Sequence, residues 1–322
     1  YQQQIWNRPA VRHKEFSQNL PPLQAKQPKK PHSSRVPHFE PPPSWTASTP
    51  VFENPVKPSH ILLYYPFFLT ESETEEIQKY KEIYYVRKTR PVIPAVTADQ
   101  EFFPFVHDDH IAYRYQQLSV LGRGSFGNVI CCYDHKEKRN VAIKTLIYNR
   151  KQKSQVNFEH DVLKKCQSIS CIITHYESFI FRGFYCIVTE MLHKDLYSAL
   201  QSQRFVGFQT LQTKAVRLQV ASALAGMHAL GYVHCDMKPE NILFVDGKLL
   251  RVKVIDFGCS CSIGKNIFSY IQSRFYRAPE VVLGLKYGPP IDVWSLGCVI
   301  VEMLTGKPLF EVGDEKQLMG QM

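Results

Sequence analysis

The spacing of hydrophobic and polar positions divides the chain into a region without regular pattern, a strand-rich region and a helical region. Residues 1–60 hold few large apolar side chains. Stretches such as PPLQAKQPKKPH predict disordered or polyproline-like backbone, because they bury too little surface to offset chain entropy. Between residues 110 and 190, short apolar runs bounded by turn residues predict strands, and from about Phe208 onward longer apolar periods predict helices. We therefore expect a two-lobed α+β protein whose lobes join near residue 192.

Individual elements can be assigned within the patterned regions. LTESETEEIQKYKEIYYV begins with Thr70 three residues before Glu73, the spacing of a capping box, so a short helix is expected there. HDDHIAYRYQQLSVLGRGSFGNVICCYDH predicts a strand, a glycine turn and a second strand, and NVAIKTLI predicts a third. QVNFEHDVLKKCQS has helical periodicity, and FYCIVTEML returns to a strand. Long helices are predicted in LQTKAVRLQVASALAGMHALG and IDVWSLGCVIVEMLTG.

Composition narrows the class of protein. The 322 residues, 44% of them hydrophobic, suffice for a large core, and a net charge of +10 suits polyanionic ligands. Half of the excess positive charge lies in the first 60 residues, so a weakly basic tail explains it more simply than a nucleic-acid site. The KQPKKP stretch could alternatively be a nuclear-import patch. The nine cysteines are irregularly spaced, as expected for reduced thiols. Apolar runs are too short for membrane helices and no secretory signal opens the chain, so we expect a cytoplasmic or nuclear location.

Two segments of the strand-rich region offer candidate phosphate contacts. LGRGSFGNV, at 121–129, places three glycines between two strands, where the lack of Cβ atoms lets backbone N–H groups approach phosphate oxygens. A glycine triplet in a hairpin is as often only a turn. Lys144 of VAIK would need a carboxylate partner if buried, and Glu159 on the following helix is the candidate. Taken alone, a surface lysine and a solvated glutamate are the simpler alternatives.

HCDMKPENILF, at 234–244, and VIDFGCSC hold the candidate catalytic groups. Asp236 can accept or orient a hydroxyl proton, and Lys238 can neutralise charge on a transferring phosphoryl group. Asn241 and Asp256 offer the hard oxygen ligands that Mg²⁺ prefers. An APE triplet follows the DFG triplet at the expected order, and the whole set predicts phosphoryl transfer, which depends on positioning and charge neutralisation.

From about Tyr115 to the end, this series of motifs resembles a eukaryotic protein kinase. HCD, YIQSRFYRAPE, DHIAYRY and IDVWSLGCVIVEMLTG are similar to the dual-specificity tyrosine-phosphorylation-regulated kinases. LTESETEEI and EIYYV are similar to the N-terminal accessory region of that family's second class, which supports tyrosine autophosphorylation during maturation. The resemblance covers roughly residues 69–322.

The resemblance implies a bilobal protein kinase fold, with a small antiparallel-sheet N-lobe and a larger helical C-lobe, and ATP with Mg²⁺ as cofactors. It implies a tail, an accessory segment, an N-lobe and an incomplete C-lobe, at residues 1–60, 61–114, 115–192 and 193–322. Catalytic and metal-binding roles fall on Lys144, Glu159, Asp236 and Lys238, and on Asn241 and Asp256. The implied ATP-binding residues are Leu121, Gly122, Arg123, Gly124, Ser125, Phe126, Gly127, Asn128, Val129, Ala142, Lys144, Thr189, Glu190, Met191, Leu192 and Asp195.

Cys235 stands where most kinases place an Arg before the catalytic Asp. That Arg pairs with a phosphorylated residue of the activation loop, which Cys cannot do. The resembled family also has Cys there, and its loop is organised by a phosphotyrosine whose counterpart is Tyr270. The resemblance implies Arg274 and Arg277 as partners of that phosphate, with Arg277 also shaping a site for Pro after the phosphoacceptor. It thus implies autophosphorylation of Tyr270 and phosphorylation of Ser or Thr before Pro in protein substrates, often with an upstream Arg.

Four positions depart from the family pattern. Phe268 replaces the first tyrosine of a Tyr-x-Tyr pair, and Thr189 replaces Phe before the hinge, which should open a back pocket and change inhibitor selectivity. Cys259 replaces Ser after the DFG glycine, and Asp195 replaces Asn near the ribose. None of these changes removes a catalytic group.

The chain runs from Tyr1 to Met322 and ends within a mixed apolar and charged stretch, so we expect a fragment of a longer protein. The resemblance places the Arg partner of Glu280 beyond Met322. A buried, unpaired carboxylate at Glu280 would cost several kcal/mol, so we expect the fragment to be destabilised and the full-length protein to be active.

Other interpretations stay open. A pseudokinase-like scaffold that binds partners through the Pro-rich tail is the main rival, although every catalytic side chain is present. A cyclin-dependent or mitogen-activated relative fits HCD and the accessory segment less well. HDDH at 107–110 has metal-ligand residue types whose consecutive side chains splay apart, and Cys259 with Cys261 could form a redox pair, although ordinary thiols are favoured. We expect a monomer acting on protein substrates, with neither a membrane nor nucleic acid as partner.

Overall fold

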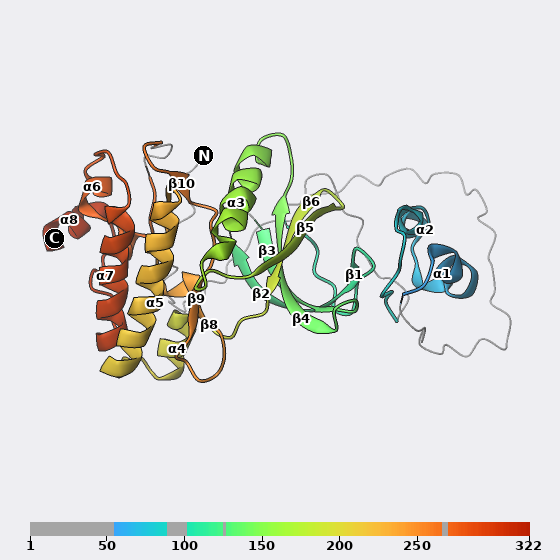
Figure 1. Cartoon of the computed structure of the whole chain (residues 1–322), viewed down its shortest axis with the longest axis horizontal. Helices are drawn as coiled ribbons and strands as arrows, with labels where there is room; N and C mark the ends of the chain where they lie inside the picture. Colours follow the sequence, from blue (N-terminus) through green and yellow to red (C-terminus); the bar gives the residue numbers. More distant parts are fainter. Residues whose placement is uncertain (1–54, 89–101, 125–126, 266–269) are drawn as a thin grey trace, which may run out of the picture. The chain divides into compact units, whose positions relative to one another are not determined.

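A computed structural model of the chain describes four stretches, residues 55–88, 102–124, 127–265 and 270–322. The predictions for the tail and its KQPKKP patch, and those for Ser125, Phe126 and Phe268, lie outside the described residues. All described residues belong to one compact unit, Phe52–Met322. Within it, an antiparallel sheet with one long helix precedes a helical lobe (Figure 1). The predicted α+β fold class is therefore confirmed.

The first lobe is a six-stranded antiparallel sheet in the order β1-β2-β3-β4-β6-β5. Its strands are β1 (His110–Ile111), β2 (Tyr115–Gly124), β3 (Gly127–Asp134), β4 (Arg139–Ile147), β5 (His175–Phe181) and β6 (Phe184–Glu190). β2, β3, β4 and β6 follow the predicted runs, whereas β1 and β5 were not predicted as separate strands. β5 gives no period-two signal because only Phe181 among its seven residues is fully buried.

Both faces of this sheet are covered. On one face, Ile143 of β4 and Cys186 of β6 belong to a core of buried side chains from the strands. On the other face, Leu146 and Ile187 pack in the core that also contains Val162 of α3 (Lys153–Lys165). Because successive side chains of a strand point to opposite faces, β4 and β6 contribute to both cores. This two-sided burial explains why cysteines occur in the strands as reduced, apolar side chains.

The accessory segment contains α1 (Pro58–Tyr64), α2 (Glu71–Glu76) and two 3₁₀ turns, η1 (Pro66–Phe68) and η2 (Ile77–Lys79). The predicted capping box is present, because Thr70 accepts from the Glu73 N–H and Glu73 accepts from the Thr70 N–H. The short helix expected after Thr70 is α2. Since α1 begins at Pro58, the predicted tail boundary at residue 60 falls inside a helix.

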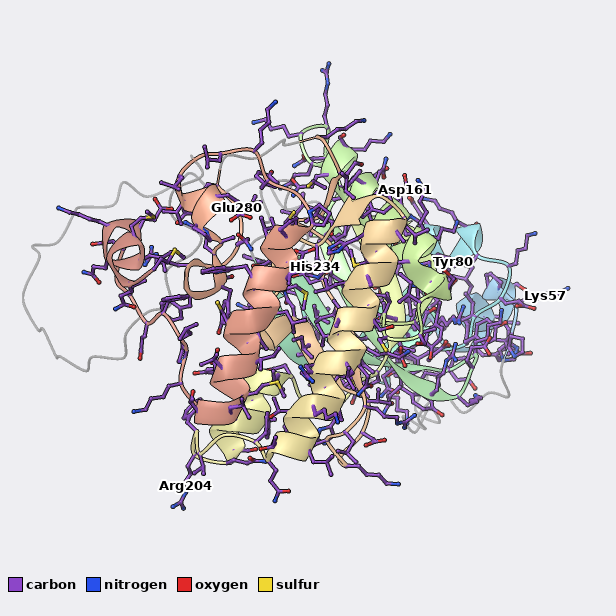
Figure 2. The ribbon with its side chains drawn as sticks, turned by 60° about the vertical axis from the view of Figure 1, so that its left-hand side comes forward. Lys57, Tyr80, Asp161, Arg204, His234 and Glu280 are labelled. Carbon is purple, nitrogen blue, oxygen red and sulfur yellow. The ribbon has the colours of Figure 1, made fainter. Side chains whose placement is uncertain are left out.

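The second lobe is mainly helical. Its helices are α4 (Leu196–Ser202), α5 (Thr210–Ala229), α6 (Pro279–Val282), α7 (Pro290–Thr305) and α8 (Glu315–Gln321). Short strands connect them: β7 (Tyr232–Val233), β8 (Ile242–Phe244), β9 (Val252–Val254) and β10 (Cys261–Ser262). α5 and α7, both predicted as helices from their periodicity, pack side by side (Figure 2). In the described part of the chain, no helix is both long enough and apolar enough to cross a membrane.

Candidate active site

Three charged residues from three elements meet where the two lobes join. Lys144 Nζ of β4 lies 2.6 Å from Glu159 Oε1 of α3 and 2.9 Å from Asp256 Oδ1. Asp256 follows β9 and has a φ of 63°, an uncommon backbone conformation for a non-glycine residue. At Gly258, an added Cβ would lie 3.2 Å from Glu159 Oε2 and 3.3 Å from Asp256 Oδ1, so the missing side chain lets these carboxylates approach. The structure therefore brings together the predicted Lys144, Glu159 and Asp256.

The electrostatics of this triad favour a charged lysine between two different carboxyls. Burial by itself would lower the pKa of Lys144, but the charges of Asp256 and Glu159 outweigh it and raise that pKa. Burial would raise the pKa of Asp256, and Lys144 reverses this and holds it well below its usual range. For Glu159, burial prevails over Lys144 and the pKa is raised. Asp256 thus stays ionised over the whole neutral range.

The loop after β7 positions Asp236, which is 3% exposed. Lys238 Nζ lies 2.6 Å from Asp236 Oδ2, and Ser273 donates to Asp236 Oδ1 from its hydroxyl at 2.8 Å and its N–H at 3.2 Å. Burial raises the pKa of Asp236, although Lys238 opposes this. Ser273 was not anticipated from the sequence. Its signal was a hydroxyl in the YIQSRFYRAPE stretch, but only the folded chain shows that it contacts Asp236.

A buried aspartate on α7 holds this loop in an uncommon backbone conformation. Asp292 accepts from the N–H groups of His234 and Cys235 at 2.8 and 2.9 Å, and from His228 Nε2 at 2.9 Å. Cys235 has a φ of 66°. Asp292 is fully buried, so its hydrogen bonds hold the loop in this strained backbone conformation. In the sequence Asp292 only interrupted an apolar run, and its positioning role was missed.

His234 links the same loop to the DFG segment. Its Nδ1 accepts from the Asp236 N–H at 3.2 Å, so its Nε2 must carry the proton that is donated to the Ile255 carbonyl at 3.0 Å. The His234 ring also contacts Phe257, with a ring-centroid separation of 5.6 Å. His234 is thereby held as the neutral tautomer, and the loop bearing Asp236 is tied to the segment bearing Asp256.

Asp256 and Asn241 fit a divalent metal ion by the chemistry of their donors. Asp256 presents an ionised carboxylate with its side chain 42% exposed. Asn241 donates its amide nitrogen to the Asp236 carbonyl at 2.7 Å, which leaves the amide oxygen as the ligand atom. A carboxylate and an amide oxygen are the donors that Mg²⁺ takes in proteins.

The glycine-rich segment spans the turn between β2 and β3, with Gly124 paired to Gly127. A Cβ at Gly127 would lie 1.7 Å from the Thr145 carbonyl oxygen of β4, so packing in the sheet itself requires glycine there. Around Gly122 there is open space. Asn128 is buried and donates to the Phe103 carbonyl at 3.0 Å, so its side chain holds the segment preceding the sheet. The remaining implied nucleotide residues of this segment, Leu121, Arg123 and Val129, lie in β2 and β3.

The predicted hinge lies at the end of β6, whose last residues are Thr189 and Glu190. Thr189 is buried opposite Ala142 of β4 and donates to its carbonyl at 3.3 Å. The Glu190 side chain accepts from the Thr174 N–H and from Lys253, and thus ties the hinge to β9. Met191 and Leu192 then lead to α4. Asp195 caps α4, accepting from the Ser198 N–H at 2.7 Å and its hydroxyl at 2.6 Å, so both carboxylate oxygens already have donors.

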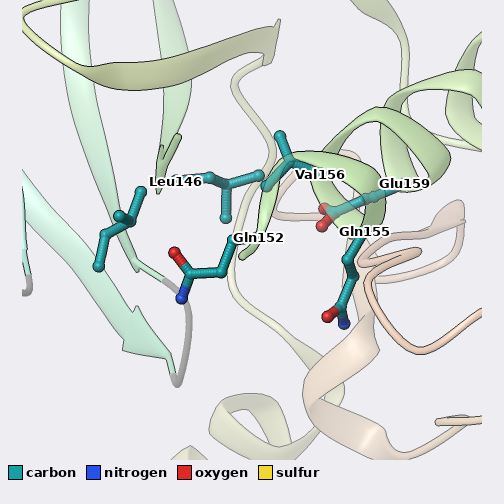
Figure 3. A pocket seen from close by; sticks show the side chains of 6 residues that line it. Leu146, Gln152, Gln155, Val156 and Glu159 are labelled. Atoms are coloured by element: carbon teal, nitrogen blue, oxygen red, sulfur yellow. The ribbon is translucent and has the colours of Figure 1, made fainter. Parts of the chain in front are cut away.

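A small pocket lies between β4 and the first turns of α3 (Figure 3). Its lining residues are Leu146, Ile147, Gln152, Gln155, Val156 and Glu159. Its volume of about 10 Å³ is close to that of one water molecule, which excludes a nucleotide. Gln155 donates to the Gly258 carbonyl at 3.2 Å and links α3 to the DFG segment.

Residues 115–322 match the family model described as "Protein kinase domain". The chain belongs to the protein kinases. It is 39% identical to the DYRK-family kinase pom1 of Schizosaccharomyces pombe, over 82% of this chain and 26% of pom1. It is 38% identical to the dual specificity tyrosine-phosphorylation-regulated kinase 3 of Mus musculus, over 81% of this chain and 47% of the relative. This kinase chain therefore spans less than half the length of either relative.

The activation segment of this kinase ends in a buried polar network. Tyr270 is 44% exposed, and its ring lies 4.0 Å from the guanidinium of Arg277. Gln272 has a φ of 63° and donates to the Ile291 carbonyl and the Ser295 hydroxyl on α7, at 2.9 and 2.8 Å. Gln272 was not singled out from the sequence, because nothing near it in the chain distinguishes it from a surface glutamine.

The thiols at this site pair differently from the predicted alternative. Cys235 Sγ lies 3.5 Å from Cys261 Sγ, while Cys259 packs against the same apolar cluster. The pKa of the Cys259 thiol is raised, mainly by burial. The nine cysteines are all free thiols. Cys259 and Cys261 therefore do not form the local pair that their spacing suggested.

The HDDH stretch contributes to an ion cluster that joins the accessory segment to the sheet. Glu73 Oε1 accepts from Arg87, from His110 Nε2 at 3.2 Å and from Arg182 Nη2 at 2.7 Å. Arg87 Nε also lies 2.9 Å from Asp109 Oδ1. Glu73, Asp109 and His110 have metal-ligand atoms close together, but the Arg87 guanidinium lies between the carboxylates. Arg87 thus pairs with both carboxylates, and the arrangement is an ion cluster.

Glu280 differs from its prediction. It is only half-buried, and it lines an open hollow with Pro289, Pro290, Val293 and Trp294. Its carboxylate is therefore not fully removed from water, which reduces the desolvation cost that was expected to destabilise the chain. That expectation was wrong in its premise of a buried carboxylate.

Proposed function

We propose that the protein transfers the γ-phosphoryl group of ATP to Ser and Thr of protein substrates, preferring residues followed by Pro, and autophosphorylates Tyr270. The strongest support is the close assembly of Lys144, Glu159 and Asp256 beside a buried Asp236. The relatives named dual-specificity kinases support the same activity. The catalytic turnover and the substrates are proposals, since the relatives extend well beyond the matched region.

Each residue has a role that follows from its contacts. Lys144, charged and held by Glu159, binds nucleotide phosphates as a fixed cation. Asp236, positioned by Ser273, accepts or orients the proton of the attacking hydroxyl. Lys238, next to Asp236, neutralises charge on the transferring group. When bound at Asn241 and Asp256, Mg²⁺ supplies charge neutralisation at the phosphates.

The reaction balances without a covalent enzyme intermediate. The acceptor oxygen forms a bond to the γ-phosphorus while the bond from phosphorus to the bridging oxygen of ADP breaks, and the hydroxyl proton leaves toward Asp236. For autophosphorylation the acceptor is the Tyr270 hydroxyl, which belongs to a half-exposed side chain. A cytoplasmic or nuclear location and a monomeric state stay predictions of the same proposal.

The decisive experiment compares the full-length protein with its Asp256→Asn form on a Ser-Pro peptide. We expect magnesium-dependent phosphate transfer that falls by on the order of 10³ in the variant. Asp246→Asn, at an exposed turn between β8 and β9, is the matched control and should keep its activity. Equal activity of wild type and Asp256→Asn would favour the scaffold interpretation. Mass spectrometry of the purified protein, grown without other kinases, should find phosphate on Tyr270.

A further inference from the structure

The arginines next to Tyr270 are already bound to other groups when the tyrosine carries no phosphate. Arg277 is 1% exposed and the Tyr270 ring covers its guanidinium. Its Nη1 donates to Glu315 of α8, and its Nε and Nη2 donate to the Gln272 carbonyl at 3.3 and 2.8 Å. A phosphate on Tyr270 could bind Arg277 only by replacing one of these partners.

The two acceptors differ in how readily they can leave Arg277. Gln272 is fixed in the interior, because its side-chain amide donates to the Ile291 carbonyl and the Ser295 hydroxyl. Glu315 is the first residue of α8, and its side chain is 45% exposed. Its carboxylate can return to water with little cost, because the Glu315 side of the pair is already partly solvated although Arg277 is buried. Glu315 is therefore the partner that a competing anion would displace.

The second arginine contacts the same stretch of chain. Arg274 Nη1 donates to the Gly313 carbonyl, two residues before Glu315. Both arginines implied in phosphate binding thus also hold residues 313–315. An anion that attracts both guanidinium groups would weaken both contacts together.

We propose that Glu315 occupies Arg277 while Tyr270 is unmodified, and that a phosphate on Tyr270 displaces Glu315 and loosens the first turn of α8. This inference rests on the proposed phosphorylation of Tyr270. A phosphate carries a charge of about −1.5 to −2 at pH 7 and offers several acceptor oxygens, so it outcompetes a single carboxylate for a guanidinium. Phosphate oxygens bind the edge of a guanidinium, so the Tyr270 ring turns off the face of Arg277 as Glu315 leaves.

The test uses the full-length protein with phosphotyrosine incorporated directly at position 270, beside the same protein with tyrosine. Hydrogen exchange of residues 313–321 should be about fivefold faster in the phosphorylated form. In Glu315→Gln, exchange should be fast in both forms. Glu311→Gln changes the same charge at an exposed position and should keep the phosphate-dependent difference. Equal or slower exchange on phosphorylation, or a difference that persists in Glu315→Gln, would overturn the inference.

A second measurement follows the competition for Arg277 through the rate at which the phosphate is removed. A tyrosine phosphatase should remove the phosphate several-fold more slowly from Glu315→Gln than from wild type, because Arg277 then binds it without a competitor. Equal rates would contradict the proposal. Because the phosphotyrosine is incorporated directly, these outcomes do not depend on autophosphorylation. A purified wild-type protein without phosphate on Tyr270 would refute the proposed autophosphorylation and leave this test intact.

Discussion

The cluster of charged side chains around Glu73 differs in exposure from the cluster around Lys144. The side chains of Glu73 and Arg87 are 2% and 4% exposed, and both belong to the contact between the accessory segment and the sheet. The side chains of Lys144 and Asp256 are 25% and 42% exposed, at the junction of the lobes. The first cluster is shielded from water, whereas the second is partly exposed and therefore accessible to a ligand.

The pKa directions show the consequence of that difference. Burial would raise the pKa of Glu73, but the hydrogen bond and charge of His110, the Thr70 N–H and Arg87 together lower it strongly. Around Lys144, the pKa of Glu159 is raised by burial while that of Asp256 is lowered by Lys144. The Glu73 cluster satisfies its charge internally and holds two segments together. In the Lys144 cluster, the two carboxyls have pKa values shifted in opposite directions, and both can respond to a bound nucleotide.

The largest expected effect is on activity. Lys144→Met should lower kcat/KM by on the order of 10³, because the fixed cation for the phosphates is lost. The free energy of unfolding of the Lys144→Met variant should differ from that of the wild type by less than about 2 kcal/mol, since Lys144 is partly exposed. Kinetics and chemical denaturation of the same preparation measure both. A large loss of stability would show that the Lys144 cluster is structural, like that of Glu73.

Next, Glu73→Gln should lower the free energy of unfolding by about 3 kcal/mol, because the buried Arg87 loses one of its two carboxylate partners. Glu75→Gln, an exposed substitution on the same helix, is the matched control and should change it by less than about 0.5 kcal/mol. Urea denaturation measures both variants. If the two variants unfold alike, the ion cluster does not stabilise the accessory segment.

Acid should separate the two clusters. Asp236 has a raised pKa and cannot accept a proton once protonated, so activity should fall at a pH above the ordinary Asp value of about 3.9. The folded pKa of Glu73 is depressed, so its stabilisation is complete above the unfolded value of about 4.3 and is lost as the pH falls toward the folded pKa. A pH profile of kcat/KM, compared with hydrogen exchange of residues 55–88, should show activity lost first. Coincident transitions would contradict this order.

The smallest expected effect is at the rim of the Glu73 cluster. Arg182 donates to Glu73 and to both oxygens of Glu76, and a lysine cannot reproduce that fork. Arg182→Lys should therefore cost about 1 kcal/mol of unfolding free energy. Arg150→Lys at an exposed position should be neutral, and thermal unfolding compares the two. Equal midpoints of thermal unfolding would mean that the contacts between Glu76 and Arg182 do not stabilise the accessory segment against the sheet.

The catalytic candidates could be predicted because their identities are set by short local patterns. Asp236, Lys238 and Asn241 lie within one loop, and Asp256 lies in a triplet, so their order in the chain was enough. Ser273 and Asp292 escaped prediction because their partners at 234–236 are 37 to 58 residues away. The structure also corrected the reading of Gly127, which the sheet needs for packing against Thr145.

By itself, the sequence determined the two-lobed fold class, most of the strands and helices, and the residue types that can bind nucleotide and metal, because periodicity and short motifs are local properties of a chain. Only the tertiary structure decided which charges meet. It set Glu73 against Arg87 and Arg182, and Glu315 against Arg277, across separations of 14, 109 and 38 residues. Such pairs form because burial leaves a charge no solvent partner, and which opposite charge comes near it depends on how the whole chain packs.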